Sequence, residues 1–476
     1  MAASGVARAF VLVGCVWTGV FGAVATAGAQ GAADAYFEFL MARRLESQGD
    51  FTGAQAALER ATRADARSAE IWAELAAFHI RRSQPEEAER AAKAGLAIDD
   101  ANLEAHRSLG LVYAGYTDAA TPRTQQSPEI TQFMRDALVH LERAATGPSA
   151  ANDLLLNYTL GRLYLRNGTP EKGVEALTRT LAQNPGSVQT RLVLAQAYAA
   201  SNDLAGAIAT LDAVVDDEPR VAAVLGQYQE RAGLLKEAAV SYTKALEAQP
   251  MSREIKFRRI AVLAEAREYK AAAAFAADAR KQHPEDVRFP RLQGRALFDG
   301  GDRSGGLAVL EGAVRAFPRD VPTQYALANL YSDAGRGPDA ERTLRTILTI
   351  EPANANALNY LGYLLAKRGQ QLDEAVDLVR RALAVEPDNG AYLDSLGWAL
   401  FRKGDLVEAE KYLGQAVERL PGNSEVLDHL GDLYARRGRW QDAVGAWTRA
   451  LDGDGHDIDR AEVQRKLADA RAKLRR

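Results

Sequence analysis

Prolines recur along this chain at a nearly constant interval, and this feature limits the possible folds more strongly than any other. Half of the 16 prolines are separated by 34, 31, 34, 34, 34, 35 and 34 residues. These are Pro185, Pro219, Pro250, Pro284, Pro318, Pro352, Pro387 and Pro421. A period of this length is typical of proteins built from stacked units that pack on their neighbours. The 476 residues therefore do not divide into the roughly three globular domains that length alone suggests.

Two other positions of the unit carry small residues. With the proline numbered as position 32, position 8 is Ala or Gly in eleven of twelve units and position 20 in all twelve. Position 8 is occupied by Ala42, Ala76, Gly110, Gly161, Ala195, Gly226, Ile260, Gly294, Ala328, Gly362, Gly397 and Gly431. Position 20 is occupied by Ala54, Ala88, Ala137, Gly173, Ala207, Ala238, Ala272, Gly306, Ala340, Ala375, Ala409 and Ala443. Small side chains let two antiparallel helices approach closely, so each unit is predicted to be a helical hairpin.

Turn residues separate the two expected helices of most units. Glycine stands near position 15 in eight units, at Gly49, Gly168, Gly233, Gly301, Gly335, Gly369, Gly404 and Gly438. There it ends the first helix, because it adopts left-handed backbone angles without steric cost. The proline at position 32 stops the second helix. Helices of about a dozen residues are marginal alone, so the hairpins must stack into one all-α array.

The combined pattern has Leu-Gly at positions 7 and 8, Tyr or Leu at 11, Ala at 20 and 27, and Pro at 32. It resembles the tetratricopeptide repeat over about residues 35–457, which would hold twelve repeats. The resemblance implies an α-solenoid with a right-handed superhelix, whose first helices line a concave groove that binds a protein or peptide. No nucleic acid partner is expected, because 59 basic residues face 63 acidic ones and the net charge is −4.

Three segments depart from the repeat. Residues 116–131 are predicted to be an insertion in the hairpin turn of the third unit, either a neutral loop or a partner contact. Units 6 and 7 are the weakest, with Arg259 and Ile260 in place of Leu and Gly, and a local change of curvature is expected there. Residues 458–476 are predicted to be a capping helix. Its apolar face would consist of Val463, Leu467, Ala470 and Leu474. The alternative is that this basic end contacts anionic lipid.

Residues 1–29 have the pattern of a secretory signal peptide. Arg8 precedes an apolar stretch, and the small residues that follow allow cleavage after Ala27 or Ala29. The only cysteine, Cys15, follows Leu-Val-Gly, which resembles the lipobox of bacterial lipoproteins and would make Cys15 the site of lipidation. Soluble export is favoured, because the residues after Cys15 remain apolar; an uncleaved anchor is a third reading. Each places the body outside the cytoplasm, in the periplasm or at the outer membrane.

No catalytic or metal-binding motif is evident. Phosphate-loop, nucleophile-elbow and H-E-x-x-H patterns are absent, and the repeats leave only 19 residues after unit 12, so no enzyme and no cofactor are predicted. The glycine-rich run 300–306 is interpreted as the turn of unit 8. His429 with Asp428 and Asp432 would at most bind a metal weakly. Residues 452–459 resemble a calcium loop but lack its glycine and its glutamate.

The positions near 2, 5, 9 and 12 of the first helices give a candidate binding strip. It runs from arginines through amides and aromatics to aspartates, which suits an extended peptide. Its residues are Arg288, Arg291, Arg295, Tyr325, Asn329, Ser332, Asn356, Asn359, Tyr363, Asp394, Trp398, Phe401, Asp428 and Asp432. An ordinary solvated inner face is an equally good interpretation.

Two functions follow from this interpretation. The first is a non-catalytic scaffold or adaptor of the cell envelope that holds a protein or an extended peptide in its groove. Residues 358–451 are similar to bacterial envelope tetratricopeptide proteins, including outer-membrane adaptors that dock a periplasmic protease and its substrates. The second is a structural or assembly factor for an envelope machine of secretion, pilus formation or polysaccharide export. The sequence does not identify the partner.

Overall fold

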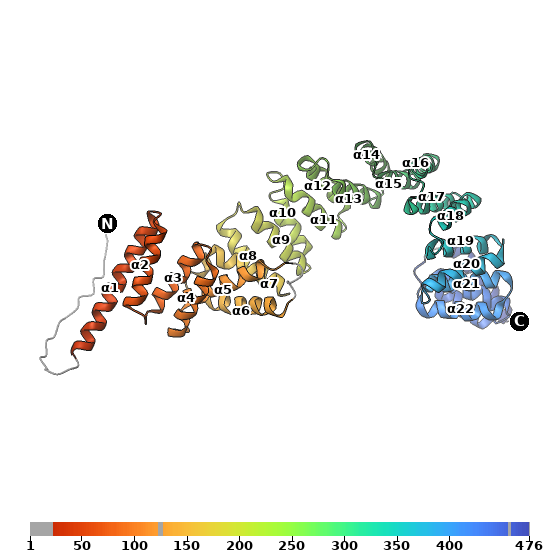
Figure 1. Cartoon of the computed structure of the whole chain (residues 1–476). Coiled ribbons are helices and arrows are strands. Elements are labelled where there is room, and N and C mark those ends of the chain that lie inside the picture. Colours follow the sequence, from red (N-terminus) through yellow and green to blue (C-terminus); the bar gives the residue numbers. More distant parts are fainter. Residues whose placement is uncertain (1–21, 122–126, 456–457, 476) are drawn as a thin grey trace, which may run out of the picture. The chain divides into compact units, whose positions relative to one another are not determined.

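The computed structural model describes residues 22–121, 127–455 and 458–475, which form helices and turns without a β-strand (Figure 1). The all-α prediction is therefore confirmed for these residues. The helices belong to two compact units, Met1–Gly233 and Leu234–Arg476. The boundary lies in the turn between the two helices of the sixth repeat, which is one of the two repeats that match the pattern least well.

The first unit is a series of short helices of similar length. They are α1 (Gly22–Ser47), α2 (Phe51–Ala64), α3 (Ala69–Arg81), α4 (Pro85–Ile98), α5 (Leu103–Asp118), α6 (Pro128–Ala144), the 3₁₀ turn η1 (Ala150–Asn152), α7 (Leu154–Arg166), α8 (Pro170–Gln183), α9 (Val188–Ala200), α10 (Leu204–Asp212), the 3₁₀ turn η2 (Pro219–Val221) and α11 (Ala222–Arg231).

The second unit continues in the same way. Its helices are α12 (Leu235–Ala248), α13 (Arg253–Glu265), α14 (Tyr269–Gln282), α15 (Arg288–Asp299), α16 (Arg303–Ala316), α17 (Val321–Asp333), α18 (Gly337–Ile350), α19 (Ala355–Arg368), α20 (Leu372–Val385), α21 (Gly390–Lys403), α22 (Leu406–Arg419), α23 (Ser424–Arg436), α24 (Trp440–Asp452) and α25 (Arg460–Leu474).

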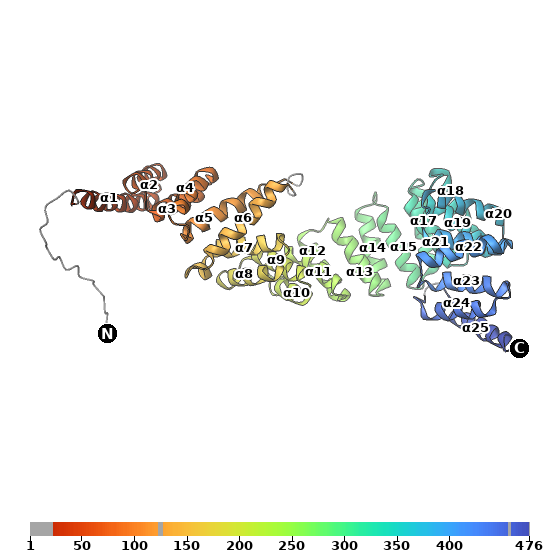
Figure 2. The ribbon, with the colours of Figure 1, turned by 90° about the horizontal axis from the view of Figure 1, so that it is seen from below.

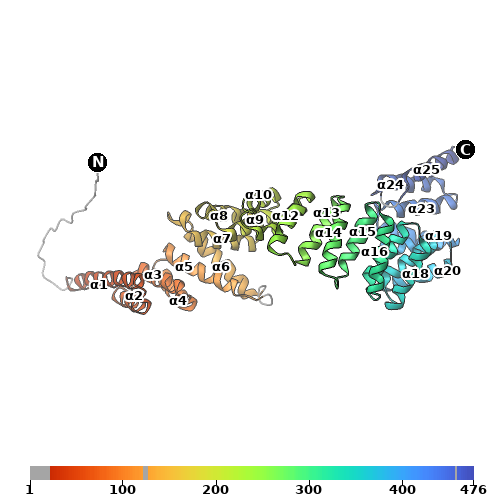
Figure 3. The same cartoon turned by 90° about the horizontal axis from the view of Figure 1, so that it is seen from above.

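Consecutive helices pair as hairpins, and neighbouring hairpins stack. In the second unit α21 packs on α22 and α23 on α24, and the first helices α19, α21 and α23 also contact one another in sequence (Figure 2). The same succession is visible from α13 to α16 (Figure 3). Each unit is thus an α-solenoid in which the first helices form one layer and the second helices another.

Positions 8 and 20 have the role that the sequence predicts. All twenty-four of their residues are buried, because the two helices of a hairpin cross at these points. At Gly362, an added Cβ would lie 2.5 Å from Val379 Cγ2 and 2.9 Å from the backbone oxygen of Ala375. Both distances are shorter than real Cβ contacts, so the hairpin of α19 and α20 closes only around a glycine.

The turn glycines also behave as predicted. All eight at position 15 have positive φ. In three further units, position 15 holds a residue other than glycine, and its backbone is also left-handed. The φ angles are 55° at Ser83, 63° at Asn202 and 60° at Arg267. The geometry of the hairpin thus imposes this backbone angle even on Ser83 and Arg267, whose side chains disfavour it.

The proline ladder marks the ends of the second helices. Seven of the eight prolines lie two residues beyond a helix end, as Pro352 does after α18. Pro219 is the exception, since it begins the 3₁₀ turn η2 seven residues after α10 ends. The shortened interval that follows it therefore reflects an irregular junction, in which this proline stands at the start of the next helical segment.

In repeat 7, the unusual residues Arg259 and Ile260 pack against matching side chains of the second helix. Ile260 is fully buried against a second helix, α14, that presents the small side chains of Ala272 and Ala276. The guanidinium of Arg259 lies 4.0 Å from the centroid of the Phe275 ring, in place of the usual leucine contact. A large residue at position 8 is thus matched by small residues opposite it.

Helices occupy both ends of the predicted insertion in repeat 3. Helix α5 extends to Asp118, and Ser127 caps α6 by accepting a hydrogen bond from Ile130 N at 3.3 Å. Residues 122–126, in the middle of the segment 116–131, lie outside the described residues. The helices of this hairpin are therefore longer than those of its neighbours.

The two ends of the chain are described to different extents. Helix α25, within the predicted cap 458–476, buries Val463, Leu467 and Ala470 against α24, whereas Leu474 is 44% exposed and lies outside that contact. Cys15 and most of the predicted signal peptide 1–29 lie outside the described residues. None of the helices in the described part of the chain combines the length and the apolar character needed to span a bilayer.

Candidate binding groove

The first helices of the second unit enclose a cavity of about 300 Å³ on the predicted binding strip. It extends over α17, α19, α21 and the start of α23. Its lining residues are Tyr325, Asn359, Tyr360, Tyr363, Ala391, Asp394, Ser395, Leu420, Asn423, Glu425 and Val426. Four of the predicted strip residues, Tyr325, Asn359, Tyr363 and Asp394, thus share one site. We call this cavity the groove pocket.

Aromatic side chains form one side of the groove pocket. The rings of Tyr325 and Tyr360 lie 5.7 Å apart at 52°, and burial raises the pKa of both hydroxyls. The Tyr363 hydroxyl donates a 2.6 Å hydrogen bond to Glu425 Oε1, from a helix two repeats away. These tyrosines therefore offer ring faces and neutral hydroxyls rather than charges.

An amide lies deep in the same pocket. Asn359 Oδ1 is buried and accepts no hydrogen bond within the described structure. A buried acceptor without a donor costs about 1–3 kcal/mol, so it is retained where it serves a purpose. Its neighbour Asn356 lies on the exposed side of α19, where its Oδ1 accepts a 2.8 Å hydrogen bond from the Tyr392 hydroxyl.

Asp394 and Trp398 have a structural role that the sequence did not reveal. His429 Nδ1 lies 3.0 and 3.1 Å from the two carboxylate oxygens of Asp394, and both residues are buried. The Trp398 ring stacks on the His429 ring, with centroids 4.0 Å apart. Phe401 is also buried, in contact with Trp398. These residues join α21 to α23, and Asp394 among them lines the groove pocket.

The three predicted arginines lie outside the pocket, and two of them have carboxylate partners. Arg288 is bound to Asp286 by two hydrogen bonds of 2.9 and 2.7 Å. Arg295 pairs with Asp299 at 2.7 Å and with Asp333 at 3.2 Å. Arg291 is half-buried on the same helix, α15. The positive start of the predicted strip is therefore separate from the aromatic and amide middle.

Two other polar residues of the strip also lie outside the pocket. Asn329 and Ser332 are half-buried on α17 and do not line the cavity.

The acidic end of the predicted strip pairs with a lysine from the terminal helix. Lys466 on α25 pairs with Asp428 at 3.0 Å and with Asp432 at 2.8 Å. Both carboxylates at this end of the strip are therefore paired with one lysine of the same chain.

Neither weak metal motif of the sequence forms a metal site in the described residues. Asp428 and Asp432 bind Lys466, and His429 binds Asp394. In the calcium-like segment, Asp454 accepts a hydrogen bond from Ser424 N at 3.1 Å, while residues 456–457 lie outside the described part. No group of three or more His, Cys, Asp or Glu side chains in the described chain is arranged to hold an ion.

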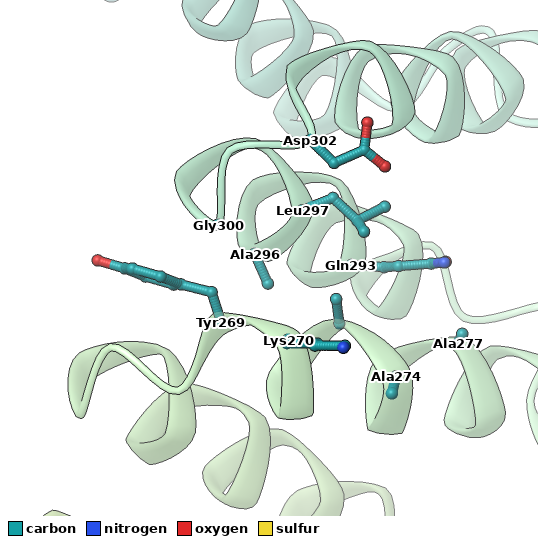
Figure 4. A pocket seen from close by; sticks show the side chains of 10 residues that line it. Tyr269, Lys270, Ala274, Ala277, Gln293, Ala296, Leu297, Gly300 and Asp302 are labelled. Atoms are coloured by element: carbon teal, nitrogen blue, oxygen red, sulfur yellow. The ribbon is translucent and has the colours of Figure 1, made fainter.

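The glycine-rich run 300–306 begins with the predicted turn, residues 300–302, and continues as the first residues of α16. Gly301 has a φ of 97°, and Asp302 caps α16 by accepting a hydrogen bond from Gly305 N at 2.8 Å. A cavity of about 480 Å³ lies beside this turn, between α14 and α15. Figure 4 shows Ala274 and Ala277 along one wall, with Ala296 and Leu297 along the other. The small residues of α14 line it together with the polar side chains of Lys270, Gln293 and Asp302.

Sequence reasoning missed two important residues of the groove pocket. Glu425 stands at position 2 of the last repeat, a position already assigned to the strip, so the sequence contained the signal. Tyr360 stands at position 6, and only its pairing with Tyr325 shows that it faces the groove. The sequence pattern does not give the register between helices of different repeats, and this register decides which side chains share the pocket.

The hairpin repeats and their first-helix layer define a helical-repeat protein of the kind that binds other proteins. Sequence profiles described as tetratricopeptide repeat match residues 45–110, 164–228, 297–359, 224–287, 368–424 and 426–460. Together they cover well over half of the chain, which belongs to the tetratricopeptide repeat family. Such repeats support a protein–protein interaction scaffold, and the family is generally non-catalytic.

Known relatives are similar over limited regions or at low identity. A TPR repeat-containing protein of Pseudomonas aeruginosa is 32% identical over 155 residues, which are 32% of this chain and 26% of the relative. The chain thus spans about a quarter of the length of that relative. Yeast Tom70 shows 13% identity and a TM-score of 0.44 over 93% of this chain and 96% of its own. A thermophilic TPR protein of Thermus thermophilus shows 22% identity and a TM-score of 0.34, over 39% and 98% of the two chains.

Proposed function

We propose that this chain is a non-catalytic adaptor that holds an extended segment of a partner protein against the first helices of its second unit. The groove pocket is the observation that carries the proposal, because it brings together aromatic, amide and carboxylate groups from four first helices. Such a lining provides ring faces for packing and acceptors for backbone N–H groups. Most other charged residues of the strip are paired within the chain. The pocket is therefore the best candidate for contact with a partner protein.

The spacing of the helices suits an extended peptide. Packed helices lie about 8–10 Å apart, and an extended chain advances about 3.3 Å per residue. A peptide that crosses α19, α21 and α23 would therefore place about every third side chain against a new helix. The intervening residues would face solvent. This geometry predicts recognition of a short linear segment of the partner.

A substitution that fills the pocket tests this function. Ala391 is exposed in the first turn of α21 and lines the pocket, so Ala391→Trp blocks it without removing an existing contact. Ala384 is also exposed, but it lies on the second helix α20, so Ala384→Trp is the matched control. Affinity capture from cell-envelope extract is compared between the wild-type chain and the two variants.

The outcomes separate the two functions considered for this chain. If the groove holds the partner, Ala391→Trp loses proteins that the wild-type chain and Ala384→Trp both retain. An unchanged set of captured proteins would contradict the proposal and favour docking between repeats, as in an assembly factor. Recovery of a periplasmic protease in the groove-dependent set would identify the adaptor as a protease adaptor, the role suggested by the similarity of residues 358–451 to such proteins.

We further propose that the adaptor acts outside the cytoplasm, in the periplasm or at the outer membrane. The proposal is supported by the leader-like composition of residues 1–29. Cell fractionation and sequencing of the mature N-terminus test it, and soluble export predicts a start after Ala27 or Ala29. Palmitate labelling that disappears in Cys15→Ala would instead establish a lipoprotein. An intact N-terminus in the cytoplasmic fraction would contradict export.

A further inference from the structure

We propose that the groove pocket receives a basic side chain, arginine or lysine, of the bound peptide. This inference rests on the proposed function and assigns a ligand chemistry to the same site. Among the residues that line the pocket there is no lysine, arginine or histidine, whereas two carboxylates, two amides and a serine are present. The described pocket is therefore rich in hydrogen-bond acceptors and in negative charge.

Glu425 supplies the charge for this recognition. Asp394 is already bound to His429, so its carboxylate is largely compensated within the chain. Glu425 lies in the first turn of α23 and accepts the Tyr363 hydroxyl through one of its two oxygens. A carboxylate has about four lone-pair sites, so it can accept further N–H donors while that hydrogen bond persists. Hydrogen bonds from a cation to a carboxylate are about twice as strong as neutral ones.

Asn359 adds a second acceptor. Its buried Oδ1 accepts no hydrogen bond from the described residues, and the side chain lines the pocket. A guanidinium group has five N–H donors and an ammonium group three, so either supplies more donors than a neutral side chain. A cation placed between Asn359 and Glu425 would therefore bond the carboxylate and approach the amide in one position.

The tyrosines favour the same ligand. Tyr325, Tyr360 and Tyr363 line the same pocket as the acceptors, and a cation is attracted to the face of an aromatic ring. Lys367 already lies 5.6 Å from the centroid of the Tyr363 ring, on the side of α19 toward the helix end. An acidic peptide is disfavoured at this site, because Glu425 would repel it and the described lining of the pocket holds no lysine, arginine or histidine.

A peptide library provides the first step of the test. Random peptides displayed on phage are selected on the purified full-length chain and counter-selected on Ala391→Trp. We expect the retained peptides to share an arginine or lysine. Peptides that depend on the pocket but lack a common basic residue would overturn this inference and leave the proposed function intact. Failure to retain any pocket-dependent peptide would contradict both.

A double-mutant cycle then locates the basic residue. The best peptide is synthesised with its basic residue as arginine or as citrulline, which keeps the shape and removes the charge. Fluorescence anisotropy measures each form on the wild-type chain, on Glu425→Gln and on Glu418→Gln. Glu418 is exposed on the second helix α22 and serves as the matched control.

The expected result is a loss of affinity of about tenfold or more on replacing arginine by citrulline with the wild-type chain and with Glu418→Gln. With Glu425→Gln, the same replacement should change the affinity less than about threefold, because the charge partner has been removed. An equal loss on all three chains would show that the basic residue binds elsewhere and would overturn the assignment.

Discussion

The hydroxyl of Tyr363 on α19 donates a 2.6 Å hydrogen bond to the carboxylate of Glu425 on α23. The two residues belong to repeats 10 and 12, so the bond passes over the intervening repeat. Most contacts in such arrays join neighbours only. This bond therefore links α19 directly to α23 across α21 at the groove pocket and holds the carboxylate in a defined place beside the tyrosines.

Removal of the Tyr363 hydroxyl should weaken both the array and the pocket. Tyr363→Phe is expected to reduce the free energy of unfolding by about 1.5–3 kcal/mol, since a hydrogen bond to a charged group is lost while the ring remains. Thermal unfolding followed by circular dichroism measures the change. Tyr412→Phe, on α22 and half-buried, is the control, and an equal effect of both variants would contradict the role assigned to this bond.

The close approach of the hairpin helices can be tested with two glycines. Gly362→Ala should destabilise the chain by about 1–3 kcal/mol, because the new methyl would overlap Val379 and the backbone of Ala375. Gly414 is also helical but has no neighbouring atom within 4 Å of an added Cβ, so Gly414→Ala should stabilise it by about 0.5–1 kcal/mol. Melting temperatures that move in the same direction would refute this account of position 8.

Replacing a left-handed turn residue by glycine should stabilise the chain, in contrast to the destabilisation expected for Gly362→Ala. Arg267 has a φ of 60° in the turn between α13 and α14. Arg267→Gly should raise the stability by about 1 kcal/mol, because glycine adopts this angle without the steric penalty of a Cβ. Gly404→Ala, at the equivalent position with a φ of 95°, should lower it by a similar amount. Chemical denaturation of both variants measures whether the free energy of unfolding rises for Arg267→Gly and falls for Gly404→Ala.

The buried pair of His429 and Asp394 should make stability depend on pH. Burial alone lowers the pKa of His429, but the Asp394 carboxylate raises that pKa above the ordinary value of 6.5. A raised folded-state pKa means that the stabilisation is fully present below about pH 6.5 and is lost as the pH rises through the folded value. Asp394→Asn should therefore lower the melting temperature more at about pH 6 than at about pH 9.

A surface aspartate provides the control for the pH experiment. Asp377 is exposed on α20 and makes only a 3.9 Å pair with Arg381 among the interactions described for it. Asp377→Asn should change the melting temperature by the same small amount at both pH values. A pH-independent effect of Asp394→Asn would contradict the charged state assigned to His429.

The repeat architecture could be predicted from single positions, because each position has a local physical role. Gly362 and Gly369 are required by a helix crossing and by a left-handed turn within one hairpin, and the sequence shows both directly. Ser83 and Arg267 were not predicted as turn residues, because their side chains do not favour positive φ. There the packing of the hairpin overrides the local preference.

The groove was predicted less completely, because it depends on contacts between repeats. Tyr325, Asn359 and Tyr363 were assigned to the correct face by their position in the unit. Asp394 pairs with His429 of the next repeat and Asp428 with Lys466 of the terminal helix, and spacing alone does not reveal such partners. Charge in the strip was therefore overestimated, and Glu425 was missed.

Site-specific photocrosslinking tests the central claim most directly. A photoreactive phenylalanine analogue is placed at position 391, in the groove pocket, or at position 384, on the second-helix layer, of the full-length chain in producing cells. If the partner binds in this groove, position 391 crosslinks to a partner protein and position 384 does not. Crosslinks of equal yield from both positions, or from position 384 alone, would contradict partner binding in this groove.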